Sequence, residues 1–382
     1  MGNGILVITN PEIVKNINLL LVSWIKKIGL SHNNIYTYSK VGVNLKKIRS
    51  TQEDIGKMIS ETYSFQNIGK IRSGFGHYSG LINLGKNVLA LHTDGVGTKV
   101  LVVQKMKRFD TIGIDCIAMN VNDVICTGAE PFAFVDYIGL KSVNDKLVKK
   151  LIKGLVNGAR SARVSIVGGE TAIIPELLSG HSKHMFDLAG TALGITGKDK
   201  LILGRNIQIG DTILGVESNG LHSNGYTLAR KVLSKYSIYD IPQFLTKPLG
   251  EKLLNPTKIY VRPVMEIINK HDIDIHGLAH ITGGAFTKLK RLNNKVRYNI
   301  SEFPPIEGIF RLIQNDGKID IKEMYKTFNM GIGFCIVLPK NHVDKTISIF
   351  DKYKINTYTI GKIDGKGTGN VVVKVGDKKH IL

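Results

Sequence analysis

A carboxylate, two glycines, a hydroxyl and a lysine follow one another in the segment T-D-G-V-G-T-K, residues 93–99. The segment comes directly after Val88-Leu89-Ala90-Leu91, an apolar run that predicts a short buried strand. Glycines let backbone N–H groups approach phosphate oxygens, a lysine supplies a point charge, and Asp94 can hold a divalent cation. These residue types therefore predict a phosphate-binding loop at the C-terminal end of a strand.

A second group of polar residues lies on a predicted helix that contains Asp115, Asn122 and Asp123. Asp115 and Asn122 are seven residues apart and lie nearly above one another, while Asp123 lies about 80° further round the helix. Carboxylates from a strand end and from a helix face suit a site for a metal ion and a triphosphate. The alternative is structural, because Asp-Gly is a common turn dipeptide and an isolated Asp often caps a helix.

The chain has 382 residues, a length that favours two domains, and its 43% hydrophobic and 22% charged residues are typical of a soluble globular protein. The longest apolar run near the start, residues 17–25, is too short to cross a bilayer and lacks a signal-peptide cleavage site. Cys116, Cys126 and Cys335 are isolated thiols without metal-binding spacing, which favours buried, reduced cysteines. We therefore expect a cytoplasmic protein with no membrane partner.

The formal net charge of +21 is the one bulk property that favours a nucleic-acid partner. However, the lysines are scattered in pairs such as Lys149-Lys150 and Lys378-Lys379, and there is no helix-turn-helix, zinc-finger or aromatic RNA-binding signature. A solvated basic surface that attracts anionic substrates is the simpler interpretation. A non-catalytic nucleic-acid-binding protein is the alternative, but it leaves the glycine-rich segments unexplained.

Apolar strand-like runs alternate with amphipathic helix-like runs along two consecutive parts of the chain. We predict an N-terminal α/β domain for ATP binding and dimerisation at residues 38–203 and a C-terminal α/β domain at residues 204–382. The predicted strands are 88–91, 132–138, 164–167, 187–195, 212–216, 277–281 and 332–338, and the predicted helices are 144–162, 257–268 and 340–352, with another after Asn224. Residues 1–37 form a basic leader, which is an accessory helix, a partner-binding arm or a disordered segment.

Glycines mark several predicted strand ends, mostly beside a hydroxyl or a carboxylate. These segments are 73–76, 168–171, 218–220, 282–284 and 331–333. Each alone is a weak signal, since Gly-Gly usually marks a turn, but together they are better explained by loops that line a phosphate-rich cleft. Neither the P-loop motif nor a G-x-G-x-x-G that opens a helix after a strand is present, so an ATP site here uses another arrangement.

Further motifs follow in an order that the chain shares with one enzyme family. They are D-T-I-G-I-D (110–115), A-M-N-V-N-D (118–123), G-A-E-P (128–131), V-G-G-E-T-A (167–172), D-L-A-G (187–190), H-S-N-G-Y (222–226), P-T-K-I-Y-V (256–261), H-I-T-G-G (280–284) and E-M-Y-K-T-F-N-M-G-I-G (323–333). Together with T-D-G-V-G-T-K, they cover roughly residues 38–375. The chain resembles the aminoimidazole ribonucleotide synthetase family, also called phosphoribosylformylglycinamidine cyclo-ligase.

Three positions depart from the family pattern. The loop at 74–80 has fewer glycines, Ile173-Ile174 stands where an acidic residue and Met are common, and Ala285 replaces a third glycine after Gly283-Gly284. These departures affect the fine geometry of the loops and not the reaction class.

The resemblance implies an α/β (α+β) fold of two domains, in which the N-terminal sheets of two subunits pair into a barrel across a homodimer. It implies ATP- and Mg²⁺-dependent ring closure of formylglycinamidine ribonucleotide to aminoimidazole ribonucleotide, with release of ADP and phosphate, a step of purine biosynthesis. No nucleic-acid partner is implied. A small-molecule kinase of the same superfamily is the alternative, because it would share Asp94 and Asp123 but transfer the phosphoryl group outright.

The resemblance also implies roles for individual residues. Asp94 and Asp123 are the expected metal ligands, and the expected catalytic residues are Asp123, His222 and Lys99, with Lys99 on the triphosphate. The residues expected to bind ATP or phosphate are Gly74, Gly76, Asp94, Gly95, Gly97, Thr98, Asp115, Asn122, Gly169, Glu170 and Thr171, and Glu170 is a third candidate metal ligand. Those expected to bind the substrate are Ser223, Asn224, Thr282, Gly283 and Asn329. His222 could instead bind phosphate or act as a structural cap, and Asn329 could instead shape a turn.

Overall fold

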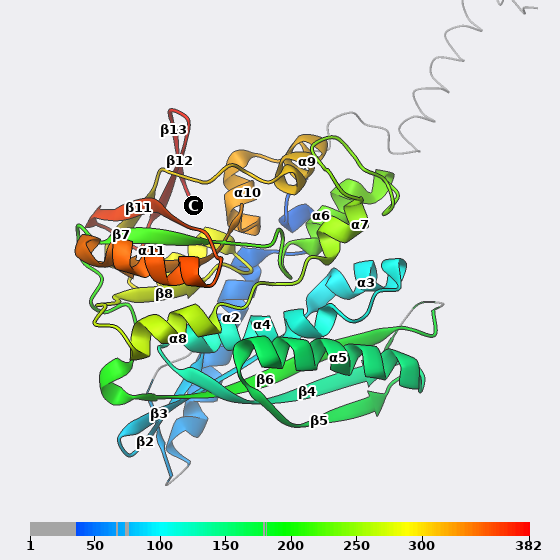
Figure 1. Cartoon of the computed structure of the whole chain (residues 1–382), viewed down its shortest axis with the longest axis horizontal. Helices are drawn as coiled ribbons and strands as arrows, with labels where there is room; N and C mark the ends of the chain where they lie inside the picture. Colours follow the sequence, from blue (N-terminus) through cyan, green and yellow to red (C-terminus); the bar gives the residue numbers. More distant parts are fainter. Residues whose placement is uncertain (1–35, 66–67, 73–75, 179, 181) are drawn as a thin grey trace, which may run out of the picture.

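The computed structural model describes residues 36–65, 68–72, 76–178, 180 and 182–382, which form two β-sheets with helices packed around them (Figure 1). The predicted leader lies outside the described residues except for Tyr36 and Thr37. Within the described ranges, no helix is long and apolar enough to cross a membrane.

Six strands form the N-terminal sheet, in the spatial order β1-β2-β3-β6-β4-β5. They are β1 (Lys70–Ile71), β2 (Gly80–Leu84), β3 (Asn87–Gly95), β4 (Glu130–Leu140), β5 (Ser165–Ile173) and β6 (Phe186–Gly197). β4 and β5 run parallel because a helix connects them, and the other neighbouring pairs are antiparallel. The predicted strand at 88–91 is confirmed, and Asp94 lies near the end of β3.

Helices cover one face of this sheet. The helical segments of this half are η1 (Ser39–Val41), α2 (Leu45–Ser60), η2 (Glu61–Ser64), η3 (Gly97–Lys99), α3 (Val100–Met106), α4 (Ile112–Ile125), α5 (Asp145–Ala162) and η4 (Lys198–Lys200). α4 and α5 lie between this sheet and the C-terminal half in Figure 1. Their backbones meet closely at Gly113, where an added Cβ would lie 2.2 Å from the backbone nitrogen of Leu155. Only glycine permits this contact, so α4 and α5 pack with their backbones in direct contact.

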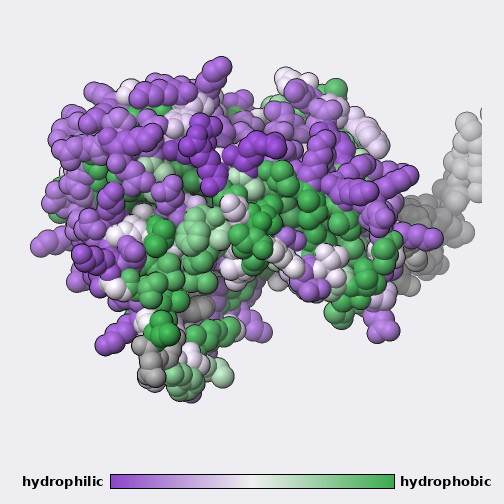
Figure 2. All heavy atoms as spheres, turned by 60° about the horizontal axis from the view of Figure 1, so that its bottom comes forward, coloured by the Kyte–Doolittle hydropathy of each residue, from purple (hydrophilic) through white to green (hydrophobic). Residues whose placement is uncertain are grey.

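The opposite face of the N-terminal sheet exposes apolar side chains. Leu91, Phe132, Val135, Tyr137, Val167 and Ile195 are each between 36% and 66% exposed. They come from β3, β4, β5 and β6, and Figure 2 shows a broad hydrophobic surface when this side of the molecule is turned forward. We call these six residues the open apolar face.

Seven strands form the C-terminal sheet, in the order β13-β12-β9-β11-β7-β10-β8. They are β7 (Thr212–Glu217), β8 (Gly277–His280), β9 (Val296–Ile300), β10 (Ile332–Leu338), β11 (Thr357–Lys366), β12 (Val371–Val375) and β13 (Lys378–Ile381). The helical segments are α6 (Tyr226–Val232), η5 (Leu233–Lys235), α7 (Leu249–Leu254), α8 (Val261–Asn269), η6 (Ala285–Arg291), α9 (Gly308–Gly317), α10 (Ile321–Thr327), η7 (Lys340–His342) and α11 (Val343–Lys352). Every residue of β10 is buried, as its uninterrupted apolar run predicts.

Two predicted elements differ from the structure at their ends. The predicted helix at 257–268 begins only at Val261, because residues 255–260 run in an extended path across α4. Pro256 restricts the residue before it to extended conformations, and side chains of α4 accept and donate the hydrogen bonds of this segment. The predicted strand at 164–167 continues to Ile173, so Gly168 and Gly169 lie inside β5 and not at its end.

The residues just before α2 pack on the C-terminal half. The Tyr36 N–H donates to the carbonyl of Gly317 (3.2 Å), and the Tyr38 N–H donates to Oε1 of Glu323 (2.8 Å). The chain crosses from one half to the other before the first strand begins. The two sheets divide the chain between Gly197 and Thr212, the segment in which the predicted boundary at 203/204 falls.

Candidate active site

A cleft of about 1090 Å³ lies between the two halves of the chain and α2. Its lining includes Gly76 and Asp94 from the N-terminal half, together with Asn224, Gly283, Lys288 and Arg291 from the C-terminal half. The remaining wall comes from η1, α2 and η2 through residues such as Glu53, Lys57 and Tyr63. The structure therefore brings four of the predicted site residues, Gly76, Asp94, Asn224 and Gly283, into one cleft. Gly74 lies outside the described residues.

A smaller cavity of about 250 Å³ adjoins this cleft and shares Asp94 and Asn224 with it. It is lined by Gly95, Gly97 and Thr98 from the Asp-Gly loop and by Ser223 and Asn224 from the H-S-N-G-Y segment. Residues that the motifs assigned to phosphate and to substrate therefore face the same space.

Asp123 is buried on α4 in a network of basic groups. Its Oδ1 lies 2.6 Å from Nδ1 of His280, and its Oδ2 lies 3.5 Å from Nε2 of His92. Burial alone would raise the pKa of the Asp123 carboxyl, but Lys288, His92 and the hydrogen bond with His280 outweigh it and hold this pKa well below its usual range. Asp123 is therefore ionised at neutral pH.

Asp94 sits in the opposite electrostatic situation. Burial raises the pKa of its carboxyl, and the neighbouring negative charge of Asp123 raises it further, against smaller opposing effects from His92 and Lys288. Its Oδ1 accepts a hydrogen bond from the Gly95 N–H (2.8 Å). A half-buried carboxylate that is repelled by a second one gains stability from any cation placed beside it.

Lys288 is the positive counterpart of these two carboxylates. It lies on η6, directly after the Gly283-Gly284 turn, and its ammonium group donates to Oγ1 of Thr282. Burial lowers the pKa of Lys288, while Asp123 and Asp94 oppose that shift. The predicted residue Thr282 thus contributes to the site by positioning Lys288.

Lys99 lies away from the cleft, at the junction between the two halves. Its ammonium is fully buried and donates to Oδ1 of Asp115 (2.9 Å), to the carbonyl of His222 (3.1 Å) and to the carbonyl of Asn255 (2.6 Å). These three bonds use all three hydrogens of the ammonium group, so none remains for a phosphate oxygen. The structure therefore does not bring the Lys99 ammonium to a triphosphate in the cleft, and we assign Lys99 to positioning.

Asp115 and Asn122 hold the same junction from one face of α4, as their spacing predicts. Oδ1 of Asp115 also accepts from the backbone N–H (2.7 Å) and the hydroxyl (2.7 Å) of Thr257 and from the hydroxyl of Ser223 (3.0 Å). The amide of Asn122 donates to the carbonyl of Lys258 (2.9 Å) and accepts from the Tyr260 N–H (3.0 Å). These polar side chains join the halves of the molecule, and neither lines the cleft.

His222 is fully buried, and its Nε2 accepts a hydrogen bond from the Asn219 N–H (3.1 Å). Burial lowers the pKa of this imidazole well below its usual range, and the charges of His280 and Lys99 add to the shift. His222 adopts a positive φ of 61°, which is uncommon for a residue with a side chain. The neutral ring stabilises its own loop and does not line the cleft, an arrangement that favours the structural cap among the three alternatives.

Asn329 and the 169–171 segment also lie outside the cleft lining. The Asn329 amide donates to the carbonyl of Gly220 (2.8 Å) and accepts from the Ser218 hydroxyl (3.1 Å), so it ties two loops together. Gly169, Glu170 and Thr171 are exposed on β5, the edge strand of the N-terminal sheet.

Several site residues were not predicted from the sequence. His92, His280, Lys288 and Arg291 contribute to the charge balance of the cleft, and α2 supplies much of its wall. His280 belongs to the H-I-T-G-G motif, and the basic residues Lys288, Lys290 and Arg291 follow the glycines of that motif within eight residues. This proximity to a glycine-rich motif is the sequence signal that could have identified them.

Two protein-family models match this chain. The model of the AIR synthase related protein N-terminal domain matches residues 76–196, and that of the corresponding C-terminal domain matches residues 208–374. The chain belongs to the AIR synthase family. The family and the two-domain fold expected from the motifs are therefore confirmed.

Relatives within the AIR synthase family are similar along nearly the whole chain. The phosphoribosylformylglycinamidine cyclo-ligase of Methanocaldococcus jannaschii is 44% identical over 358 residues, which is 91% of this chain and 99% of the relative. The enzyme of the same name from Pyrococcus furiosus is 44% identical over 347 residues, 90% of this chain and 99% of the relative. The solved structure of AaThiL complexed with AMPPCP and TMP has a TM-score of 0.59 at 17% identity, covering 89% of this chain and 98% of that one. This last similarity concerns the fold alone.

Proposed function

We propose that this chain catalyses the ATP-dependent ring closure of formylglycinamidine ribonucleotide to aminoimidazole ribonucleotide, releasing ADP and phosphate. The observation that supports it most is that Asp94 and Lys288 line a cleft formed by both halves of the chain, while the buried Asp123 carboxylate interacts electrostatically with both of them. Paired carboxylates with an adjacent cation are suited to a phosphoryl-transfer site, where developing charge must be neutralised. The family relatives carry the name of this reaction.

The chemical difficulty is that an amide oxygen is a poor leaving group. Transfer of the γ-phosphoryl group of ATP to the formyl oxygen breaks the bond between the terminal phosphorus and ADP and converts that oxygen into a phosphate ester. The amidine nitrogen then attacks the formyl carbon, the new C–N bond closes the five-membered ring, and the C–O bond breaks with loss of phosphate. The protein contributes charge neutralisation and a fixed orientation of the nitrogen, and orientation alone supplies several kcal/mol in comparable intramolecular reactions.

Roles follow from where the groups lie. Lys288 and Arg291 supply positive charge on the cleft wall for the phosphoryl group in transfer. Asn224 and Gly283 lie beside Asp94 and contact the substrate, and Gly95, Gly97 and Thr98 present backbone and hydroxyl donors from the Asp-Gly loop. These loops are positioned by four buried residues that do not line the cleft: Asp115, Asn122, Lys99 and His222.

Asp94 would hold Mg²⁺, with Asp123 as the second carboxylate. Within the described ranges, no three His, Cys, Asp or Glu side chains gather closely enough to form a metal site by themselves. Mg²⁺ usually binds through one or two carboxylates together with substrate phosphates, so this pair suits it. When bound, the ion neutralises charge on the triphosphate, and it relieves the repulsion between Asp94 and Asp123.

The working form is a cytoplasmic homodimer. The open apolar face is larger and more continuous than scattered surface hydrophobics, and pairing it with the same face of a second copy would bury it. Two N-terminal sheets joined in this way form the barrel that the motifs led us to expect. The buried, unpaired thiols of Cys116, Cys126 and Cys335 suit the reducing cytoplasm.

The test is incubation of the purified chain with formylglycinamidine ribonucleotide, ATP and Mg²⁺, with assay for the aromatic amine product and for ADP. We expect one ADP for each aminoimidazole ribonucleotide, and no product when ATP is omitted. A phosphorylated product without ring closure would identify a kinase and contradict the proposal.

A further inference from the structure

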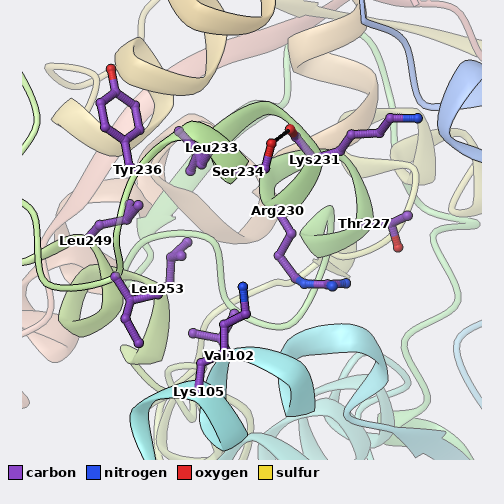
Figure 3. A pocket seen from close by; sticks show the side chains of 11 residues that line it. Val102, Lys105, Thr227, Arg230, Lys231, Leu233, Ser234, Tyr236, Leu249 and Leu253 are labelled. Carbon is purple, nitrogen blue, oxygen red and sulfur yellow. Dashed lines mark hydrogen bonds between the residues drawn. The ribbon is translucent and has the colours of Figure 1, made fainter. Parts of the chain in front are cut away.

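A second cavity, of about 320 Å³, lies between α3, α6, η5 and α7, separate from the cleft that holds Asp94 (Figure 3). Its apolar wall consists of Val102, Leu233, Ile238, Leu249, Leu253 and part of Tyr236. Its polar lining consists of Lys105, Thr227, Arg230, Lys231 and Ser234. Of these, only Thr227 also belongs to the small cavity at the Asp-Gly loop, where its Oγ1 lies 3.3 Å from Oγ1 of Thr98.

Two positive groups from different elements converge in this cavity. Figure 3 shows the Arg230 guanidinium from α6 and the Lys105 ammonium from α3 extending into the gap between the two helices, while the Lys231 side chain points away from it. The lining contains no Asp or Glu, and across the described part of the chain neither Arg230 nor Lys105 has a side-chain hydrogen bond or ion pair.

This convergence differs from an ordinary basic surface. Like charges on a protein surface normally spread apart or pair with carboxylates, since repulsion and lost hydration both disfavour their approach. Arg230 is half-buried, and this burial lowers the pKa of its guanidinium. Lys105 is exposed, and apolar residues including Val102 and Leu253 line the same cavity. An anion placed between Arg230 and Lys105 would supply the counter-charge that both groups lack and would replace hydration that Arg230 loses to burial.

We propose that this cavity binds the phosphate group of a small sugar phosphate. The planar guanidinium of Arg230 recognises two phosphate oxygens at once, and Lys105 adds a point charge from the other wall. The hydroxyls of Thr227 and Ser234 and the apolar wall are suited to a short polyol chain. The volume is at the lower end of the range for small-molecule sites, which excludes a whole nucleoside triphosphate. This inference does not depend on the proposed ligase reaction.

The experiment is calorimetric titration of the full chain with ribose 5-phosphate, with inorganic phosphate and with ribose. Four proteins are compared: the unaltered chain, Arg230→Gln, Lys105→Gln and Lys107→Gln. Lys107 is the matched control, because it is exposed at the end of α3 and does not line the cavity, so its replacement removes one nearby positive charge without altering the converging pair. The cleft at Asp94 is intact in all four proteins, so any binding there is common to them.

We expect ribose 5-phosphate to bind the unaltered chain and Lys107→Gln with affinities within twofold of each other, and to bind Arg230→Gln and Lys105→Gln at least tenfold more weakly. Ribose should not bind. Inorganic phosphate binding as tightly as ribose 5-phosphate would reject the sugar phosphate in favour of the free anion. The site itself would be rejected by equal affinities in all four proteins, or by an equal loss in Lys107→Gln, which would indicate only diffuse attraction.

Discussion

Both carboxylate oxygens of Asp115 lie 2.9 Å from the ammonium nitrogen of Lys99, and both side chains are completely buried. The pair occupies the boundary between the two halves of the chain, where Lys99 also donates to two carbonyls of the C-terminal half. Removing one partner of such a buried ion pair leaves the other charge without a counter-charge and without water, which destabilises the fold. We therefore assign the Lys99–Asp115 pair to fixing the geometry of the H-S-N-G-Y loop and not to contact with ATP.

Replacing Lys99 by methionine should destabilise the protein more than it alters ATP binding. The Asp115 carboxylate would be left buried without its partner, a change that typically costs about 3–5 kcal/mol. Urea unfolding should show this loss, and the KM for ATP of the remaining folded protein should change less than threefold. Lys235→Met is the control, since it removes an exposed pair with Asp316 (3.1 Å) and should cost about 1 kcal/mol or less. Unchanged stability with a tenfold higher KM would instead place Lys99 on the triphosphate.

Asp123→Asn should abolish turnover while the protein still folds. The substitution keeps the shape of the side chain but removes the negative charge that balances Lys288, His92 and His280. We expect kcat/KM to fall by at least a hundredfold, equivalent to about 3 kcal/mol of transition-state stabilisation. Circular dichroism should show an unchanged fold. Asp364→Asn, on the exposed pair with Arg297, is the control and should retain activity. A near-normal kcat in Asp123→Asn would remove this residue from the site.

The stability of the fold should fall as pH drops from about 6.5 to about 4, in part because of His77. Burial, with Arg291 and Arg205 nearby, lowers the pKa of His77 to about 4, although Asp123 opposes the shift. In the unfolded chain His77 has a pKa near 6.5, so it binds a proton at higher pH there than in the folded protein. The stability that neutral His77 contributes is therefore complete above about pH 6.5 and is lost as the pH falls towards 4. His77→Gln should reduce the decline in unfolding free energy across this range by roughly 2 kcal/mol. An equal change in the control His380→Gln, on β13, would contradict this account.

Ala285→Gly should stabilise the protein, although glycine usually destabilises. Ala285 adopts a φ of 42°, in the left-handed region that disfavours a Cβ, and it occupies the position where the family usually has glycine. Glycine would relieve this strain in the folded protein, whereas the more flexible unfolded chain would oppose folding. The first effect should be larger, so the free energy of unfolding should rise by about 0.5–1 kcal/mol. Thermal unfolding measures the gain. Ala229→Gly, inside α6, should lose stability by about 1 kcal/mol. A loss in both variants would show that the conformation of Ala285 carries no strain.

Val135→Lys should convert the proposed dimer into a monomer. Val135 lies at the centre of the open apolar face on β4 and is 40% exposed in the single chain. An obligate interface of roughly 2,000 Å² would have to bury the new ammonium without a partner. Val156→Lys is a closely matched control, because Val156 is 41% exposed but lies on α5, on the other side of the sheet. Sedimentation at micromolar protein should separate the two variants. An unaltered chain that is already monomeric and active would overturn the dimer.

The sequence was sufficient to predict most strands and helices, because their apolar patterns have the period that burial requires. It also predicted that Asp115 and Asn122 share a face of α4 while Asp123 points elsewhere, since helix geometry alone decides this. It was insufficient for Lys99, because a lysine in a glycine-rich loop has the same sequence pattern whether it faces a ligand or the interior. His280 and Lys288 were missed for a related reason: they approach Asp123 from 157 and 165 positions further along the chain, and local patterns contain no information about that approach.

The polar junction at Asp115 and Asn122 also restricts how ligands reach the cleft. Hinge opening would have to break hydrogen bonds to Ser223, Thr257, Lys258 and Tyr260 together, in an interior where water cannot replace them at once. Among the side chains of η1, α2 and η2 that the structure describes, none is buried. Substrate exchange should therefore proceed by displacement of α2, and its rate should respond to cross-links that tether α2 but not to cross-links between the two sheets.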